Sequence, residues 1–475
     1  MSEPGVTRAL AEALASTRYD DLSPDVREHA RRAVTDWLGS ALGGCIEPPA
    51  RLAQEVGHGF GASDECTMFG AGRASAAAAA FANGVASHIL ELDDIHKGST
   101  VHAAAPIVPA ALAVAEREHA DGRAFLTAVV VGYEAAFRIG EAVNPSHYRF
   151  FHPTGTVATF GAAAAAGSLL GLTPGRMLDA FGSAGTQAAA LWEFNADGAM
   201  SKHLHPGKAA FNGLLAADLA RVGFSGATRI LEGQRGFFRA MSESFDTGRV
   251  TAGLGSTWKI GENGYKLHAC CGHTHTAIDG AIDIRTRRGW TPRDVLAAVS
   301  ALEIETYGPG YAIVSEMSPR TPYQAKFSLA YCTVAALVEG RVDLAQFSAE
   351  RFGDDGVREP LIREMLARTR VVVADDLTAK YPGAWPVRLT LTLSDRTRES
   401  VASDYPRGNA ENPVSTAALE QKLAALVGGR FGDKVARAAL SALRGLDRAD
   451  DLAVVFSRLK IPDARIANPD ARLQR

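Results

Sequence analysis

The sequence predicts a mainly α protein, with a large all-helical domain formed by both chain ends and a smaller inserted α+β domain. Helical patterns follow one another through the first 260 or so of the 475 residues. Segments rich in β-branched residues then alternate with helical ones, and helical patterns return in the tail. We therefore expect a helical domain from residues 1–262 and 405–475, and an α+β domain over residues 263–404.

The first long helix shows how clear these patterns are. Ser23-Pro24-Asp25 combines an N-cap, a proline suited to the first turn and an acidic side chain near the positive helix end. Apolar residues recur every four positions until Gly43-Gly44. Similar runs predict helices over residues 125–143, 156–170, 174–191 and 208–221.

In the predicted strands of the second domain, apolar residues recur at every second position. Residues 387–393 alternate apolar and polar side chains, which is typical of a half-buried strand, and residues 299–307 and 369–374 are similarly β-rich. A turn-rich segment from Pro406 to Pro413 predicts the return to the helical domain.

Composition narrows the class of protein. Hydrophobic residues make up 47% of the chain, charged residues 22%, and the net charge is −3, so we expect neither a nucleic-acid nor a membrane partner. Polar residues interrupt the alanine-rich runs before they reach a membrane-spanning length. The five cysteines form no disulfide framework, and the N-terminus lacks a secretion-signal pattern. We expect a cytoplasmic protein.

Titratable residues gather in short clusters, as the segments of a composite active site do. Ten of the thirteen histidines lie in such clusters. The densest stretch, residues 88–116, places Asp93, Asp94 and His102 between two apolar segments, where charges cost desolvation energy unless they are satisfied or used.

Three further clusters are ambiguous by themselves. His152 precedes a helix start whose free N–H groups are suited to a carboxylate, although the same pattern fits a simple capping turn. The segment Lys202–Lys208 fits an anion anchor, but its local pattern favours an exposed basic turn. Residues 265–275, with two cysteines and three histidines, lie at the domain transition, where ligands often bind.

Other classes of site have weaker support. The pairs His203/His205 and His273/His275 suggest a metal, as in a metal-dependent hydrolase, but standard zinc spacings are absent from the sequence. The sequence also lacks a complete phosphate-binding motif and a G-x-S-x-G nucleophile elbow.

The ordered motifs resemble the MmgE/PrpD family, which includes 2-methylcitrate dehydratase, cis-aconitate decarboxylase and iminodisuccinate epimerase. The resemblance extends from about Leu10 to Val455. It rests on Asp36-x-x-Gly39, Ala80-Phe81-Ala82-Asn83-Gly84, His88, Asp93-Asp94, His102, His152-x-Thr154, Lys202, Lys266, His275, residues 325–329, Gly408 and Asn412-Pro413.

The resemblance implies that the α+β domain is a lid, that the active site lies between the domains without metal or cofactor, and that the protein is a homodimer. The positions that match the family's motifs imply that the catalytic residues are Asp93, His102, His152, Lys202, Lys266 and His275. They imply that the substrate-binding residues are Asp94, Thr154 and Gly155. We expect structural or rim roles for His88, His96 and Lys97.

The implied substrate is a small polycarboxylate. His102 and His152 would transfer protons next to a carboxylate, Asp93 would orient or charge an imidazole, and the lysines would stabilise negative charge. Because the segment Cys270–His273 departs from the decarboxylase pattern, we expect dehydration of a 2-methylcitrate-like hydroxy acid. Alternatives are epimerisation or isomerisation of an amino- or imino-dicarboxylate, and cis-aconitate-type decarboxylation.

Overall fold

The computed structural model of the protein describes residues 5–459 and 461, so the end of the predicted 405–475 segment lies outside the described residues. The fold is mainly α, as predicted. The chain forms two compact units, which we call the helical unit (residues 1–89, 93–263 and 415–475) and the α+β unit (residues 90–92 and 264–414).

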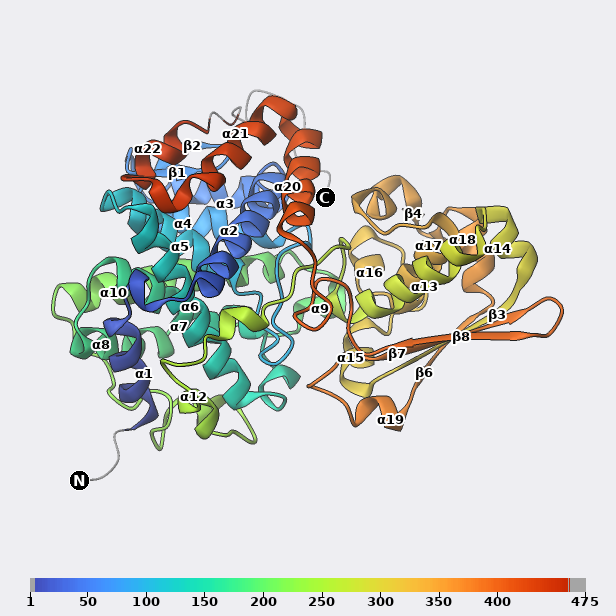
Figure 1. The fold of residues 1–475 in the computed structure, drawn as a ribbon, viewed down its shortest axis with the longest axis horizontal. Helices are drawn as coiled ribbons and strands as arrows, with labels where there is room; N and C mark the ends of the chain where they lie inside the picture. Colours follow the sequence, from blue (N-terminus) through green and yellow to red (C-terminus); the bar gives the residue numbers. More distant parts are fainter. Residues whose placement is uncertain (1–4, 460, 462–475) are drawn as a thin grey trace. The chain divides into compact units, whose positions relative to one another are not determined.

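The helical unit is built from both ends of the chain (Figure 1). Its helices are α1 Val6–Ser16, α2 Pro24–Gly44, α3 Pro48–His58, α4 Ala76–His88, α5 Ala104–Arg117, α6 Gly122–Val143, α7 Pro153–Leu169, α8 Pro174–Gly185, α9 Phe194–Asp197, α10 Ser201–Arg221, α11 Phe237–Met241, α12 Gly248–Thr251, α20 Thr416–Phe431, α21 Asp433–Arg444 and α22 Leu452–Ser457.

The predicted start and end of α2 are confirmed. The Ser23 hydroxyl accepts a hydrogen bond from the Val26 amide at 3.3 Å, Pro24 occupies the first turn, and the helix ends at Gly44. Such a cap satisfies one of the amides that a helix start leaves without a partner.

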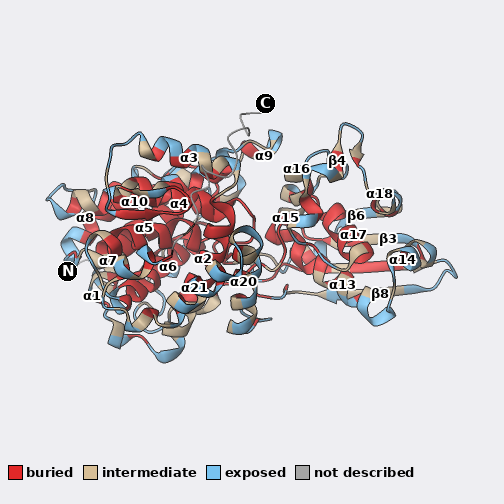
Figure 2. Cartoon of the chain, turned by 90° about the horizontal axis from the view of Figure 1, so that it is seen from above, coloured by how far each residue is buried: buried red, intermediate tan, exposed pale blue. Residues whose placement is uncertain are grey.

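Small residues allow the central helices to pack closely. Helix α7 lies against α6 and α10, and all three are largely buried (Figure 2). At the α7–α10 contact, a Cβ on Gly213 would come within 2.5 Å of the Ala162 Cβ, so the alanine-rich runs are core helices.

A short hairpin departs from the expectation of an all-helical domain. Strands β1 (Cys66–Met68) and β2 (Gly72–Ala74) pair antiparallel in the helical unit. Gly70 in the connection and Gly72 at the start of β2 adopt positive φ angles, a conformation that glycine accepts at low cost.

The α+β unit contains one four-stranded sheet of order β6-β3-β7-β8, in which β3 pairs parallel with β6 and antiparallel with β7. Helices α13 and α17 pack on it (Figure 1). The elements are α13 His275–Arg288, α14 Pro292–Ala298, β3 Val299–Thr306, α15 Gly308–Val314, α16 Pro322–Lys326, α17 Leu329–Glu339, β4 Phe352–Gly353, β5 Gly356–Val357, α18 Pro360–Leu366, β6 Thr369–Val373, α19 Asp375–Thr378, β7 Val387–Leu393 and β8 Arg398–Ser403.

Two helix predictions need correction. The helix expected over residues 174–191 ends at Gly185, and the chain beyond it runs to Ala190, whose carbonyl accepts a hydrogen bond from the His152 amide at 3.3 Å. The expected exposed turn at Lys202–Lys208 is instead the start of α10, with Lys202, His203 and His205 buried. Pro206 lies inside this helix, where a proline removes one backbone hydrogen bond.

Within residues 5–459 and 461, none of the helices has the length and apolar character that crossing a membrane requires.

Candidate active site

A buried carboxylate joins two histidines in the loop between α4 and α5. Oδ2 of Asp93 lies 2.6 Å from Nδ1 of His88, the last residue of α4, and 3.3 Å from Nδ1 of His102. Asp93 and His88 are completely buried, and His102 is almost so. The chain thus folds back so that one carboxylate serves two imidazoles.

The charge of this carboxylate is maintained by its two neighbours. Burial alone would raise the pKa of Asp93, but the charges and hydrogen bonds of His88 and His102 outweigh it and hold the pKa well below its usual range. Asp93 is therefore an anion at neutral pH, and it orients both rings through their Nδ1 atoms.

A third histidine adjoins this pair. His152 lies just before α7, and its ring centroid is 5.5 Å from that of His88 and 6.0 Å from that of His102. Its Nδ1 lies 3.0 Å from Nδ1 of His205 on α10, so one of these two nitrogens donates a hydrogen bond to the other. Trp192 and Phe194 pack against the His152 ring and shield it from water.

Both members of this histidine pair are neutral at pH 7. Burial, and then the charges of His205, His88 and Lys202, hold the pKa of His152 well below its usual range. Burial, with the charges of His88 and Lys202, lowers the pKa of His205 to about 3. A neutral imidazole with an available nitrogen can accept a proton. Lys202, buried in the first turn of α10, supplies the nearby positive charge.

The three residues expected to bind substrate have partners within the protein. Asp94 accepts hydrogen bonds from the Ala104 amide, the Tyr133 hydroxyl and the Asn263 side chain, and burial raises its pKa to about 7. The Thr154 hydroxyl accepts a hydrogen bond from the His102 amide at 3.1 Å.

Gly155 makes room for the histidine pair. A Cβ at this position would lie 3.0 Å from the His205 Cβ and 2.5 Å from the Ala190 Cβ. The structure thus shows Asp94, Thr154 and Gly155 supporting the loop and the start of α7, and their contact with substrate stays a prediction.

The other two predicted catalytic residues belong to the α+β unit. Nζ of Lys266 lies 3.1 Å from the Glu91 carboxylate, and both side chains are buried. Nε2 of His275 lies 3.3 Å from the carbonyl oxygen of Cys270. Burial lowers the pKa of His275, although the neighbouring Cys270 thiol opposes this shift. Their participation in the site stays a prediction.

Two histidines of the cluster were not among the predicted catalytic residues. His88, expected to have a structural or rim role, makes the shortest contact with Asp93, and His205 contacts His152. The sequence signals for His88 were its place in the dense stretch of residues 88–116 and its place among the motifs of the family resemblance. The proline after His205 suggested a turn and concealed the helix that carries it.

Among the described residues, two groups have side chains of the types that bind metal ions. One ring nitrogen from each of His88, His102 and His152 lies within 4.8 Å of the others, and His96, Glu141 and Glu262 form a similar group. In the second group, Nζ of Lys259 lies 3.1 Å from the Glu141 carboxylate and 3.0 Å from that of Glu262, so an ammonium already balances the two acids.

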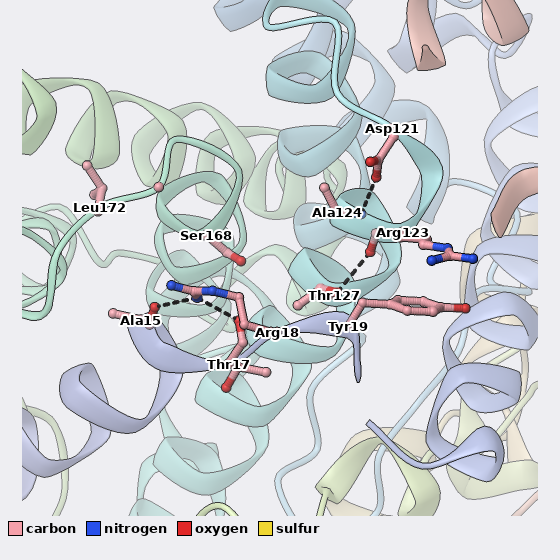
Figure 3. A pocket seen from close by; sticks show the side chains of 11 residues that line it. Ala15, Thr17, Arg18, Tyr19, Asp121, Arg123, Ala124, Thr127, Ser168 and Leu172 are labelled. Carbon is pink, nitrogen blue, oxygen red and sulfur yellow. Dashed lines mark hydrogen bonds between the residues drawn. The ribbon is translucent and has the colours of Figure 1, made fainter. Parts of the chain in front are cut away.

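A surface pocket of about 510 Å³ lies elsewhere in the helical unit, between the end of α1 and the start of α6 (Figure 3). There Arg18 donates hydrogen bonds to the carbonyl oxygens of Ala15 and Thr17, and Asp121 accepts one from the Ala124 amide. None of the predicted site residues lines this pocket.

The comparisons with known proteins identify the family. The model of the MmgE/PrpD N-terminal domain matches residues 8–249, and that of the MmgE/PrpD C-terminal domain matches residues 268–448. The chain belongs to the MmgE/PrpD family, as its motifs had indicated.

Several relatives carry a more specific name. A cis-aconitate decarboxylase of Aspergillus terreus is 26% identical over 97% of both chains, and that of Homo sapiens is 25% identical over 96% of this chain and 95% of its own. A cis-aconitate decarboxylase-like protein, oryM, of Aspergillus oryzae is 30% identical over 75% of this chain and 78% of its own. These names favour the decarboxylase alternative over the dehydration that we expected.

Proposed function

We propose that the protein is a lyase that decarboxylates a small unsaturated polycarboxylate of the cis-aconitate type. The observation that carries the proposal is the buried cluster of Asp93, His102 and His152, in a chain similar over nearly its whole length to proteins named cis-aconitate decarboxylase.

The cluster offers the two proton-transfer functions that lyase chemistry on a polycarboxylate needs. Asp93 is ionised next to His102, and this favours an imidazolium there that can donate a proton. His152 is kept neutral by burial and by nearby positive charge, and this suits it to accept one. The different surroundings of the two imidazoles thus favour an acid at His102 and a base at His152.

In decarboxylation, the bond between a carbon and a departing carboxylate breaks, and its electron pair enters the adjoining conjugated system. A proton then joins that system, carbon dioxide leaves, and the charge that develops is stabilised by a nearby cation. We assign the proton to His102 and the stabilising charge to Lys202. His152, with Nδ1–H donated to Nδ1 of His205, would keep Nε2 free to accept a proton from water and pass it to His102, which replaces the proton consumed in each turnover.

The experiment is a comparison of products. The full chain is incubated with cis-aconitate, 2-methylcitrate, and an amino-dicarboxylate, and the products are identified by mass and nuclear magnetic resonance. Release of carbon dioxide from cis-aconitate supports the proposal. Formation of an alkene from 2-methylcitrate would show that the protein is a dehydratase. Incorporation of solvent deuterium without loss of water or carbon dioxide would indicate an epimerase.

A further inference from the structure

We propose that His88, His102 and His152 form a three-histidine site for a divalent transition-metal ion such as Zn²⁺, and that the bound ion inhibits the enzyme. The binding stands on the geometry of the cluster alone. Only the inhibition rests on the proposed function, because that function requires the nitrogens of His102 and His152 for proton transfer.

The first support is convergence. One ring nitrogen of each histidine lies within 4.8 Å of the other two, and the rings come from the end of α4, the start of α5 and the start of α7. Zn–N bonds of about 2.0–2.1 Å require the nitrogens to close only modestly around an ion. Three imidazoles with an open fourth position are a familiar zinc-ligand set.

The second support is the carboxylate that lies behind two of the ligands. Nδ1 of His88 lies 2.6 Å from Asp93, and Nδ1 of His102 lies 3.3 Å from the same carboxylate oxygen. A carboxylate on one ring nitrogen directs the lone pair of the other towards a metal and raises its basicity. Here one aspartate would serve two of the three ligands.

The third support is a buried polar atom that the protein itself leaves unused. His88 is completely buried, and among the described residues its Nε2 has no hydrogen-bond partner. Buried nitrogens are normally paired, so such an atom calls for a ligand.

The second histidine–carboxylate group provides an internal contrast. Glu141 and Glu262 near His96 are already bridged by the ammonium of Lys259, at 3.1 and 3.0 Å. A cation there would have to displace the lysine, and we expect no tight binding. His96→Gln is therefore the matched control, since it removes a buried histidine from a carboxylate cluster of the same unit.

The test titrates the full chain with Co²⁺ and follows the visible absorption of the bound ion, then measures Zn²⁺ affinity by competition. We expect one ion per chain, and no binding of Mg²⁺, which prefers oxygen ligands. His88→Gln and His102→Gln should each weaken Zn²⁺ binding by at least about 100-fold, Asp93→Asn by about 10–100-fold. His96→Gln should leave the affinity unchanged.

Activity provides a separate readout. Zn²⁺ should inhibit wild-type turnover at concentrations that match its measured affinity, and chelator should restore the activity. Circular dichroism and thermal unfolding establish that each variant is folded. Absence of cobalt absorption with wild-type protein, or equal affinity in wild type and both folded histidine variants, would overturn the site. Tight binding without inhibition would overturn only the inhibitory role, and a protein without activity would leave the binding result intact.

Discussion

Nδ1 of His152 lies 3.0 Å from Nδ1 of His205; both rings are buried, with His152 just before α7 and His205 within α10. If Nδ1 of His152 carries the hydrogen of this contact, then Nε2 of a neutral His152 has a free lone pair. His205 is therefore a positioning residue for the proposed base.

His205→Leu removes this hydrogen bond, and His205→Gln retains an acceptor of similar size. We expect the leucine variant to lower kcat by about 10–100-fold and the glutamine variant to recover most of the loss. The charge of His205 helps to depress the pKa of His152, so the acid limb of the kcat profile should move to higher pH in both variants. Equal losses of kcat in the two variants, with an unchanged pH profile, would show that His205 contributes only to packing.

The proposed proton-transfer pair makes a direct prediction. His102→Gln and His152→Gln should each lower kcat by about 10²–10⁴-fold, because general acid–base groups contribute rate factors of this size. The matched control is His119→Gln, whose histidine side chain is 71% exposed and pairs with Asp451 at the surface. Steady-state kinetics measures the effect, and wild-type turnover in either cluster variant would contradict its role.

Asp93→Asn should destabilise the protein in a pH-dependent manner. The pKa of Asp93 is depressed in the folded protein, so its stabilising contribution is present above the unfolded pKa of about 3.9 and is lost as the pH falls through the folded value. The difference in unfolding free energy between wild type and variant should have its largest value at pH 6 and should decrease under strongly acidic conditions. Denaturant titration at several pH values measures it, and a difference that grows on acidification would contradict the assignment.

Asp94 should show the opposite dependence. Because its folded pKa is raised to about 7, its contribution is fully present below the unfolded value of about 3.9 and declines as the pH rises to 7. Relative to Asp94→Asn, wild-type stability should fall by on the order of 1 kcal/mol for each pH unit in this window. Thermal or denaturant unfolding from pH 4 to 8 tests this, and a flat difference would mean that Asp94 stays ionised.

The Lys266–Glu91 pair predicts a stability effect that is separate from catalysis. Both side chains are buried and lie 3.1 Å apart, so Lys266→Met should leave an uncompensated buried carboxylate and cost about 3–5 kcal/mol. The double variant Lys266→Met/Glu91→Leu should regain much of that stability. If the double variant regains stability but stays inactive, Lys266 has the further role that the family resemblance implies.

Local patterns predicted much of the fold because they depend on neighbouring residues. The capped start of α2 at Ser23, its end at Gly44, and the alternation that gives β7 at Val387–Leu393 are all read from short stretches. The start of α10 at Ser201 was missed, because the local effect of Pro206 suggested a turn, whereas the packing of α10 against α4 and α7 keeps this segment helical. The predicted domain boundaries, the lid and the homodimer stay predictions.

The sequence selected several residues that the structure brings together, but it did not predict their contacts. Spacing and resemblance selected Asp93, His102, His152 and Lys202, yet they gave no sign that Asp93 contacts both His88 and His102. The pairing of His152 with His205 joins residues 53 positions apart, and it depends on the absence of a side chain at Gly155. Such contacts arise from helix packing and are invisible in local sequence.

The most direct test of the central claim follows cis-aconitate with the purified full chain in deuterated water by nuclear magnetic resonance. We predict release of carbon dioxide and a product that carries solvent-derived deuterium, with both signals nearly abolished in His102→Gln and His152→Gln. Conversion of cis-aconitate by hydration without carbon dioxide release, or undiminished decarboxylation in both variants, would contradict the account.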